Sequence, residues 1–339
     1  MPRPRETDRG AARGEPPRVR PRRLRRNRAL RDWLAETELS ARQLVLPLFV
    51  RPGPGKPTPI PSMPGVHRWP VGSLAALGRH LVAEGVPAVL LFGAGRRKDP
   101  EGSDAWSVDG LVPEAIRALK RASPELIVAT DVCLCAYTSH GHCGLVRGRE
   151  VDNDATVDRL GRVAVAHASA GADLVAPSAM MDGQVAGLRS ALDAEGHGST
   201  AILAYSTKHA SALYGPFREA EGSRPAFGDR TTYQMDPRNA REALREMRLD
   251  AEEGADLLMV KPALTSLDLL VRARRTFDLP LAAYQVSGEY AMLKAGARSG
   301  AFREEEAVLE TLTALRRAGA DVLVTYFARD AARWLGRGR

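Results

Sequence analysis

Eight short apolar runs, separated by amphipathic segments of helical length, constrain the fold of this chain more than any other feature of its sequence. Apolar runs without polar alternation are typical of parallel strands that are covered on both faces. Eight strand–helix units over about 290 residues predict a (β/α)8 TIM barrel. The runs are Leu44–Val50, Ala88–Phe92, Leu126–Thr130, Asp173–Ala176, Ala201–Tyr205, Leu257–Val260, Leu281–Val286 and Val322–Tyr326.

A weak internal repeat supports the same unit. Gly-Ala-Asp occurs at 171–173, 254–256 and 319–321, each time after a helical pattern and before an apolar run. Glycine directly after the last helical turn is a common helix stop. A doubly wound sheet is the alternative, but no Gly-x-Gly-x-x-Gly follows the first run. The helical patterns include Val112–Arg121, Ala155–Ala170, Pro237–Glu253 and Glu304–Ala318.

The positive charge of the chain is concentrated at its N-terminus. The net charge is +8, yet residues 1–31 hold 12 arginines and 3 acidic residues, so the remainder is close to neutral. Residues 1–27 have few large apolar side chains that could offset the entropy lost on ordering. We therefore expect an Arg/Pro-rich, partly disordered arm over 1–35, which packs on a neighbouring subunit, and a single catalytic barrel over 36–339. A nucleic-acid-binding tail is disfavoured, because no aromatic residue interleaves with the arginines.

The overall composition excludes several classes of protein. Hydrophobic residues make up 44% and charged residues 27%, as in globular proteins. No uncharged apolar run approaches the roughly 20 residues of a membrane helix, so we expect no membrane partner. The N-terminus lacks the apolar core of a signal peptide. With only three cysteines, a cytoplasmic, reduced protein is expected.

Polar residues stand at the ends of most of the apolar runs. In a (β/α)8 barrel the carboxyl ends of the strands carry the catalytic groups. This rule nominates Asp131, Ser178, Lys208, Lys261, Ser287 and Tyr326.

Lysine is rare in this chain, which makes its placement informative. There are six lysines among 49 basic residues, and two of them, Lys208 and Lys261, lie at strand ends. Apolar surroundings or a neighbouring cation lower the pKa of an amine, which can then attack a ketone to form a Schiff base. The alternative is a pair of solvated or salt-bridged lysines, but two at strand ends favour covalent chemistry.

All three cysteines lie in one segment after a predicted strand. Cys133, Cys135 and Cys143 have the spacing Cys-x-Cys-x7-Cys. Three thiolates suit Zn²⁺ and leave a fourth position for water or substrate, which favours a catalytic site. Three free buried thiols are the alternative. His140 or His142 could supply a fourth ligand, although histidines beside glycine are more often solvated.

Two arginines lie in the Gly/Pro/Phe-rich segment that follows Lys208. They are Arg218, in Tyr214-Gly215-Pro216-Phe217-Arg218, and Arg230, in Phe227-Gly228-Asp229-Arg230. Guanidinium groups pair with carboxylates through two parallel hydrogen bonds. Beside a Schiff-base lysine they indicate a keto-acid substrate, whereas alone they are equally compatible with a solvated loop.

From about Arg22 to its C-terminus, the chain closely resembles porphobilinogen synthase, also called 5-aminolevulinate dehydratase. The resemblance rests on Asp131-Val132-Cys133-Leu134-Cys135, Tyr137 to Gly144, Tyr214 to Arg218, Met259-Val260-Lys261-Pro262-Ala263 and Tyr284-Gln285-Val286-Ser287-Gly288-Glu289-Tyr290. It implies a hydro-lyase that condenses two molecules of 5-aminolevulinate to porphobilinogen and two waters, early in haem and tetrapyrrole synthesis. It also implies a TIM barrel, an arm that wraps a neighbour, and a homo-octamer.

The resemblance also implies roles for individual residues. Lys261 resembles the Schiff-base lysine of the P-site substrate and Lys208 that of the A-site substrate. Arg218, Arg230 and Gln234 match the A-site carboxylate side, and Ser287 and Tyr326 match the P-site carboxylate binders. The P-site amine is matched by Asp131 and Ser178, and the pocket lining by Tyr214, Phe217 and Tyr284. Zinc ligands of the zinc-dependent branch are matched by Cys133, Cys135 and Cys143, and an allosteric Mg²⁺ ligand by Glu246.

Some positions depart from the family pattern. Ala136 and Ala179 stand where acidic residues are often found, and Thr265-Ser266 replaces a usual Pro-Tyr. None of these departures removes a catalytic group. Two other hypotheses remain: a Schiff-base aldolase on the same barrel, which needs neither the second lysine nor the cysteines, and an RNA-associated protein with a structural zinc.

Overall fold

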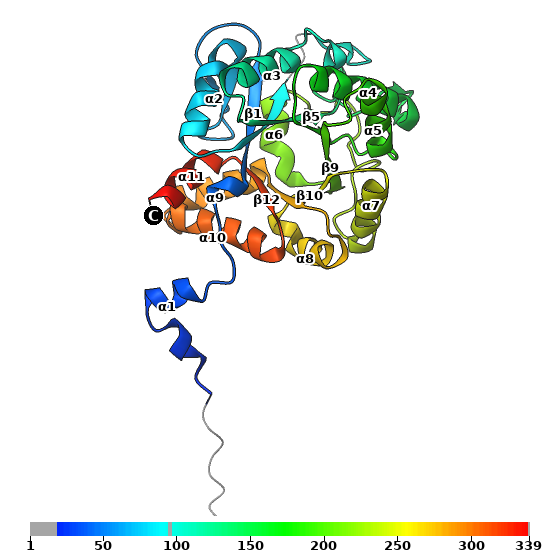
Figure 1. Ribbon diagram of the computed structural model, residues 1–339. Coiled ribbons are helices and arrows are strands. Elements are labelled where there is room, and N and C mark those ends of the chain that lie inside the picture. Colours follow the sequence, from blue (N-terminus) through cyan, green and yellow to red (C-terminus); the bar gives the residue numbers. More distant parts are fainter. Residues whose placement is uncertain (1–18, 94–96, 338–339) are drawn as a thin grey trace, which may run out of the picture. The chain divides into compact units, whose positions relative to one another are not determined.

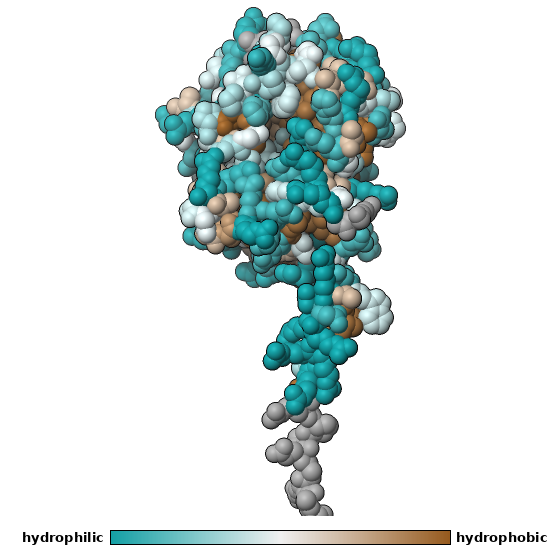
Figure 2. Space-filling view, turned by 90° about the vertical axis from the view of Figure 1, so that its left-hand side faces the viewer, coloured by the Kyte–Doolittle hydropathy of each residue, from teal (hydrophilic) through white to brown (hydrophobic). Residues whose placement is uncertain are grey.

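The computed structural model describes residues 19–93 and 97–337. The chain divides into two units, Met1–Glu38 and Leu39–Arg339. We predicted a partly disordered arm that packs on a neighbouring subunit. Residues 1–18 of this arm lie outside the described residues. The first unit contains a 3₁₀ helix, Pro21–Arg25, and the short helix α1, Arg28–Trp33, and neither buries a residue. Figure 2 shows that the described surface of this unit is mostly hydrophilic, with one small apolar cluster.

The second unit is a closed (β/α)8 barrel, which confirms the predicted fold class (Figure 1). Neighbouring barrel strands are parallel, and the pairing of the last strand with the first closes the ring. The eight strands are β1 (Leu44–Arg51), β4 (Ala88–Gly93), β5 (Ile127–Val132), β8 (Leu174–Pro177), β9 (Ala201–Lys208), β10 (Leu257–Lys261), β11 (Leu281–Gln285) and β12 (Val322–Thr325). Each lies within two or three residues of a run predicted from sequence.

Helices surround the strands, as Figure 1 shows. Their apolar faces pack on the sheet, so the strands are buried on both faces, and every residue of β4 is buried. This double burial is the reason why the strands appear in the sequence as continuous apolar runs. The outer helices are α2 (Leu74–Ala83), α3 (Leu111–Ala122), α4 (Asn153–Ser169), α5 (Gln184–Ala194), α7 (Ala240–Glu252), α8 (Leu267–Thr276), α10 (Glu304–Ala318) and α11 (Ala328–Gly336).

The Gly-Ala-Asp repeat has a structural explanation at the amino ends of the strands. The carboxylates of Asp173, Asp256 and Asp321 accept hydrogen bonds from the backbone N–H groups of Val128, Ile202 and Leu281, at 2.8, 2.7 and 2.9 Å. In each case the N–H of the aspartate donates to the carbonyl of the same partner. The repeat therefore joins three pairs of neighbouring strands: β5 with β8, β9 with β10, and β11 with β12.

Several elements have no counterpart in the sequence prediction. Between β1 and β4, strand β3 (His67–Pro70) pairs in parallel with the carboxyl end of β1 and antiparallel with the short β2 (Thr58–Pro59). A second hairpin, β6 (Val146–Arg147) and β7 (Glu150–Val151), lies between β5 and α4. Two added helices, α6 (Gly215–Glu221) after β9 and α9 (Ser287–Arg298) after β11, follow the carboxyl ends of their strands and contact each other.

Candidate active site

The structure places the polar residues predicted at strand ends at the same end of the barrel. Lys208 and Lys261 are the last residues of β9 and β10, and they are register partners in that strand pair. Asp131 lies near the end of β5. Ser178 directly follows β8, Tyr326 follows β12, and Ser287 begins α9 after β11. Parallel strands end at a common edge, so these side chains converge on the mouth of the barrel.

The amine of Lys261 lies in a cage of aromatic rings. Its Nζ lies 4.2 Å from the ring centroid of Tyr284, 4.9 Å from Tyr205, 5.1 Å from Phe217 and 5.3 Å from Tyr214. Phe217 belongs to α6, and its ring also packs on Phe92 of β4. The cage excludes water from the amine and leaves few groups to solvate its charge.

Burial and charge together favour the neutral amine of Lys261. Burial and the charge of the neighbouring Lys208 together lower the pKa of Lys261 to about 7, although Asp131 opposes the change. A neutral amine is the form that attacks a carbonyl carbon. Burial also raises the pKa of Asp131, although both lysines and the Ser178 hydroxyl counteract the rise.

Lys208 is anchored differently from Lys261. Its Nζ donates to the backbone carbonyl of Ser178 at 2.5 Å and lies 5.5 Å from the ring of Tyr205. Tyr205 is fully buried, and its ring contacts the amines of both lysines. Sequence reasoning missed Tyr205, because a tyrosine inside an apolar run gives no signal beyond core packing.

The segment between β9 and α7 supplies the predicted carboxylate-binding groups. Arg230 is buried and donates from one guanidinium nitrogen to the carbonyls of Ser223 and Gly141, at 2.6 and 3.0 Å. Arg218, on α6, is half-buried. Gln234 is 3% exposed, and neither atom of its amide has a hydrogen-bond partner among the described residues.

Unpaired buried polar atoms mark the same region. Within residues 19–93 and 97–337, they include Oδ1 of Asp131, the hydroxyl of Tyr205 and the Nε atoms of Arg218 and Arg230. Buried polar atoms without partners are costly in a folded protein and need an explanation. A polar ligand with carboxylate and amine groups would satisfy them.

The predicted P-site residues are packed against one another. The hydroxyls of Tyr284 and Tyr326 lie 3.1 Å apart. Oγ of Ser287 donates to the carbonyl of Leu213 and accepts from the N–H of Phe217, at 3.2 and 3.1 Å. Tyr214 donates to the carbonyl of Lys261 at 3.3 Å. Ser287 thus holds the loop that carries two rings of the Lys261 cage.

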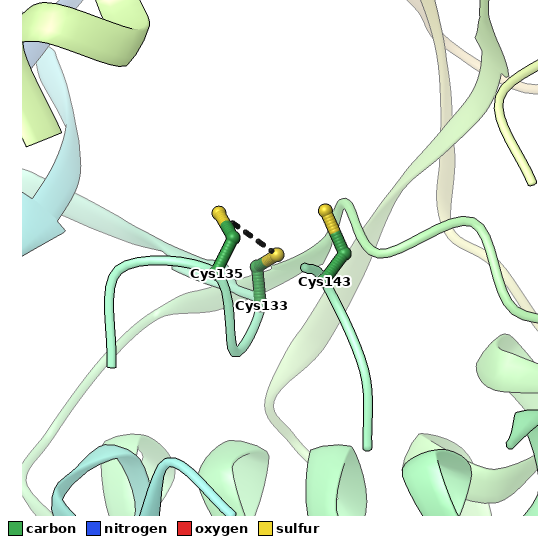
Figure 3. Close-up of side chains that lie close together, drawn as sticks. All are labelled: Cys133, Cys135 and Cys143. Atoms are coloured by element: carbon green, nitrogen blue, oxygen red, sulfur yellow. Dashed lines mark hydrogen bonds between the residues drawn. The ribbon is translucent and has the colours of Figure 1, made fainter. Parts of the chain in front are cut away.

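The three cysteines form a buried cluster that fits a metal ion. Their sulfur atoms all lie within 4.8 Å of one another, and Sγ of Cys133 is 3.4 Å from Sγ of Cys135. Tetrahedral Zn²⁺ with bonds of about 2.3 Å would place its sulfur ligands about 3.8 Å apart. Figure 3 shows Cys133 and Cys135 on one stretch of the loop and Cys143 on another. Contacts with Cys133 and Cys135 lower the pKa of the Cys143 thiol, which favours a thiolate there.

Neither candidate histidine is oriented to complete this cluster. The ring nitrogens of His142 lie 3.1 Å from the hydroxyl of Tyr233 and 3.0 Å from the carbonyl of Phe227. His140 contacts the carbonyl of Pro100 with one ring nitrogen and accepts from the N–H of His142 with the other. Both imidazoles therefore serve to fix the cysteine loop.

A buried carboxyl that the sequence did not reveal lies beside the cysteines. Glu221 ends α6, is 5% exposed, and places Oε2 3.9 Å from Sγ of Cys135. Burial and the neighbouring Asp131 raise the pKa of Glu221 to about 8, although Arg230 and both active-site lysines oppose the rise. Its position 86 residues after Cys135 gave no local signal.

Glu246 lies outside this constellation, on α7, as expected. It is half-buried in a cavity of about 840 Å³ that is also lined by Asp182, Glu242, Asp250 and Glu253. Burial raises the pKa of Glu246, and the carboxylates of Asp182, Glu242 and Glu253 add to the rise. The cavity is therefore acidic.

Comparison with known proteins identifies the family. The family model for delta-aminolevulinic acid dehydratase matches residues 18–334. The chain belongs to the delta-aminolevulinic acid dehydratase family. It is 53% identical to the delta-aminolevulinic acid dehydratase of Escherichia coli, over 92% of this chain and 96% of that protein. It is 51% identical to the same enzyme of Synechococcus elongatus, over 94% of this chain and 99% of that protein.

A solved structure of the family agrees in fold. The crystal structure of delta-aminolevulinic acid dehydratase (porphobilinogen synthase) from Toxoplasma gondii, in complex with the reaction product porphobilinogen, matches with a TM-score of 0.93. The two chains are 46% identical, and the match covers 96% of this chain and 93% of the other. The chain is therefore a lyase of tetrapyrrole synthesis that condenses 5-aminolevulinate to porphobilinogen. In the part of the chain that the structure describes, every helix is too short or too polar to cross a membrane.

Proposed function

We propose that Lys261 and Lys208 are the two covalent amines of the condensation. The observation that carries this proposal is the pairing of two buried lysines at adjacent strand ends, with Tyr205 against both amines. Each amine adds to the ketone of one 5-aminolevulinate. Protonation of each adduct and loss of one water give an iminium, which acidifies the neighbouring carbon for bond formation. The aldolase alternative needs only one of these lysines.

We assign the two substrate carboxylates to different groups of residues. Arg218, Arg230 and Gln234 bind the carboxylate of the A-site substrate, supported by the unpaired Nε atoms and the unpaired amide. Ser287 and Tyr326 bind the carboxylate of the P-site substrate, whose amine is received by Asp131 and Ser178. Fixing two flexible molecules in one geometry removes an entropic barrier to their reaction.

Zn²⁺ is the metal that we propose for the cysteine cluster. Cys133, Cys135 and Cys143 would hold it, and their burial and mutual distances suit tetrahedral thiolate ligation. When bound, the ion supplies Lewis-acid activation and orientation at the A-site. The barrel core does not depend on it, because the strands and helices are buried against one another.

An activating Mg²⁺ is proposed at Glu246. A hydrated Mg²⁺ keeps most of its waters and needs only one or two carboxylates, which the acidic cavity around Glu246 provides. We assign the ion to assembly, although the same cavity extends to Gln234, one of the residues proposed for the A-site. The enzyme works as a cytoplasmic homo-octamer whose arms pack on neighbouring subunits, and it does not bind nucleic acid.

Two measurements test the catalytic proposal. Purified protein incubated with 5-aminolevulinate should give a pyrrole that reacts with Ehrlich reagent. Borohydride reduction of the same mixture, followed by peptide mass spectrometry, should locate the covalent adducts at Lys261 and Lys208. A pyrrole without label at either lysine would contradict the covalent assignment while leaving the activity intact.

A further inference from the structure

Glu289 is a buried carboxyl that the mechanism above does not use. It belongs to the first turn of α9 and is 1% exposed. Its ordinary structural role would be a capping box, in which a glutamate at this position accepts the N–H of the residue that caps its own helix. Oε2 of Glu289 does accept from the N–H of Val286, at 2.5 Å.

A capping box does not account for the other carboxylate oxygen. Oε1 of Glu289 accepts from the N–H of Leu264 at 2.8 Å. Leu264 belongs to the loop that follows β10, three residues after Lys261. Burial raises the pKa of Glu289 to about 7, although the N–H groups of Val286 and Leu264, and more weakly those of Thr265 and Ala263, oppose the rise. One side chain thus connects the carboxyl ends of two neighbouring strands.

These two strand ends carry different parts of the site. The β10 end presents Lys261 to its aromatic cage. The β11 end presents Ser287, whose hydroxyl holds the backbone of Leu213 and Phe217. Displacement of one end relative to the other would change the distance between the amine and the groups that surround it.

We propose that Glu289 is a positioning residue, which fixes the Lys261 end of β10 against the Ser287 end of β11. The role in catalysis rests on the proposed function of Lys261, but the connection between the two strand ends does not. Lys208 provides an internal reference, because no hydrogen bond between Glu289 and the β9 end is found among the described residues.

The test uses Glu289→Gln, which keeps the shape of the side chain but turns an amide NH₂ toward one of the backbone donors. The matched control is Asp256→Asn at the opposite end of the barrel, where the carboxylate also accepts a backbone N–H from a neighbouring strand. Full-length proteins are compared by hydrogen exchange with mass spectrometry and by borohydride trapping with 5-aminolevulinate.

In Glu289→Gln we expect backbone exchange within residues 262–266 to accelerate, at Leu264 by about tenfold, because the N–H of Leu264 loses its carboxylate acceptor. Trapping at Lys261 should fall about 10- to 100-fold, while trapping at Lys208 changes less than about threefold. In Asp256→Asn the ratio of labelled Lys261 to labelled Lys208 should stay as in wild type. Glu289→Asp, whose carboxylate is one methylene shorter, should give an intermediate ratio and serves if Glu289→Gln does not fold.

Unchanged exchange in residues 262–266 would overturn the proposal. Accelerated exchange with an equal fall at both lysines would also overturn it, since that pattern indicates a general loss of structure. If wild-type protein traps no substrate at Lys261, the covalent assignment fails instead, and the exchange data alone decide whether Glu289 connects the two strand ends.

Discussion

Lys208 and Lys261 are register partners on adjacent parallel strands, and the amine of each lies against the ring of Tyr205, at 5.5 and 4.9 Å. This arrangement holds two potential cations side by side in a buried place. Their mutual repulsion adds to burial, and the pKa of Lys261 falls to about 7. The strand pairing itself thus prepares one amine for attack on a ketone.

Replacing either lysine should abolish condensation. Lys261→Ala is expected to lose nearly all activity, at least about 1,000-fold, because the covalent route is closed. Lys208→Ala should be severely impaired as well. The control is Lys56→Ala, at an exposed loop position, which should retain wild-type turnover. Pyrrole formation measured with Ehrlich reagent checks the series, and an active Lys261→Ala protein would refute the assignment.

Trapping at Lys261 should depend on pH in a specific way. Because burial lowers the pKa of Lys261 to about 7, the neutral amine and the trapping rate should increase as pH rises through about 7. Lys208→Ala removes a neighbouring cation and should move the midpoint upward. Asp131→Asn removes an anion and should move it downward. Shifts in the same direction for the two variants would be inconsistent with this electrostatic explanation.

Removing the metal should stop catalysis without unfolding the barrel. A chelator is expected to abolish pyrrole formation, and added Zn²⁺ should restore it. Far-UV circular dichroism should stay nearly unchanged, because the barrel has a large core of its own. Loss of the helical signal in the chelated protein would show that the cluster is structural.

The Glu221 carboxylate should strengthen metal binding. Above the pKa of Glu221, at about pH 9, Glu221→Gln removes a negative charge beside Cys135 and is expected to weaken Zn²⁺ affinity about tenfold. Competition with a chromophoric chelator measures the affinity directly, without reference to activity. Glu219→Gln, an exposed change on the same helix, is the control. Equal affinities in the two variants would assign no electrostatic role to Glu221.

Mg²⁺ should raise activity together with the octamer fraction. Glu246→Ala is expected to lose both responses while it keeps basal zinc-dependent turnover, because a ligand that binds one assembly better shifts the population toward it. Sizing chromatography with and without Mg²⁺ provides the measurement. Glu310→Ala, at an exposed position of α10, should respond as wild type does. A persisting Mg²⁺ response in Glu246→Ala would rule out this site.

The fold could be predicted from sequence because each barrel strand is buried on both faces and therefore consists of consecutive apolar residues. Strand ends were equally visible, since Lys261 and Lys208 are polar residues that interrupt such runs. Loops on the catalytic side were harder: α6 has only seven residues, three of them charged, and the predicted helix at Pro237–Glu253 begins only at Ala240.

The residues that sequence reasoning missed depend on contacts between distant segments. Glu221 resembles any solvated helix glutamate until α6 is packed beside the cysteine loop. From the sequence, Glu289 is an ordinary capping residue of a helix. Only the tertiary structure brings the N–H of Leu264 to the second carboxylate oxygen of Glu289. Tyr205 lies in a predicted apolar run, where a tyrosine cannot be distinguished from an ordinary core residue. Residue type and spacing describe local structure, whereas these roles arise from packing.

The aspartates of the Gly-Ala-Asp repeat join three neighbouring strand pairs of the barrel by side-chain hydrogen bonds. Asp256 joins β9 to β10, the pair that carries Lys208 and Lys261, and at the opposite end of the barrel Glu289 joins β10 to β11. Both reactive amines lie at the carboxyl ends of a strand pair whose amino ends are joined by Asp256, so the two lysines share one supported segment of the barrel wall.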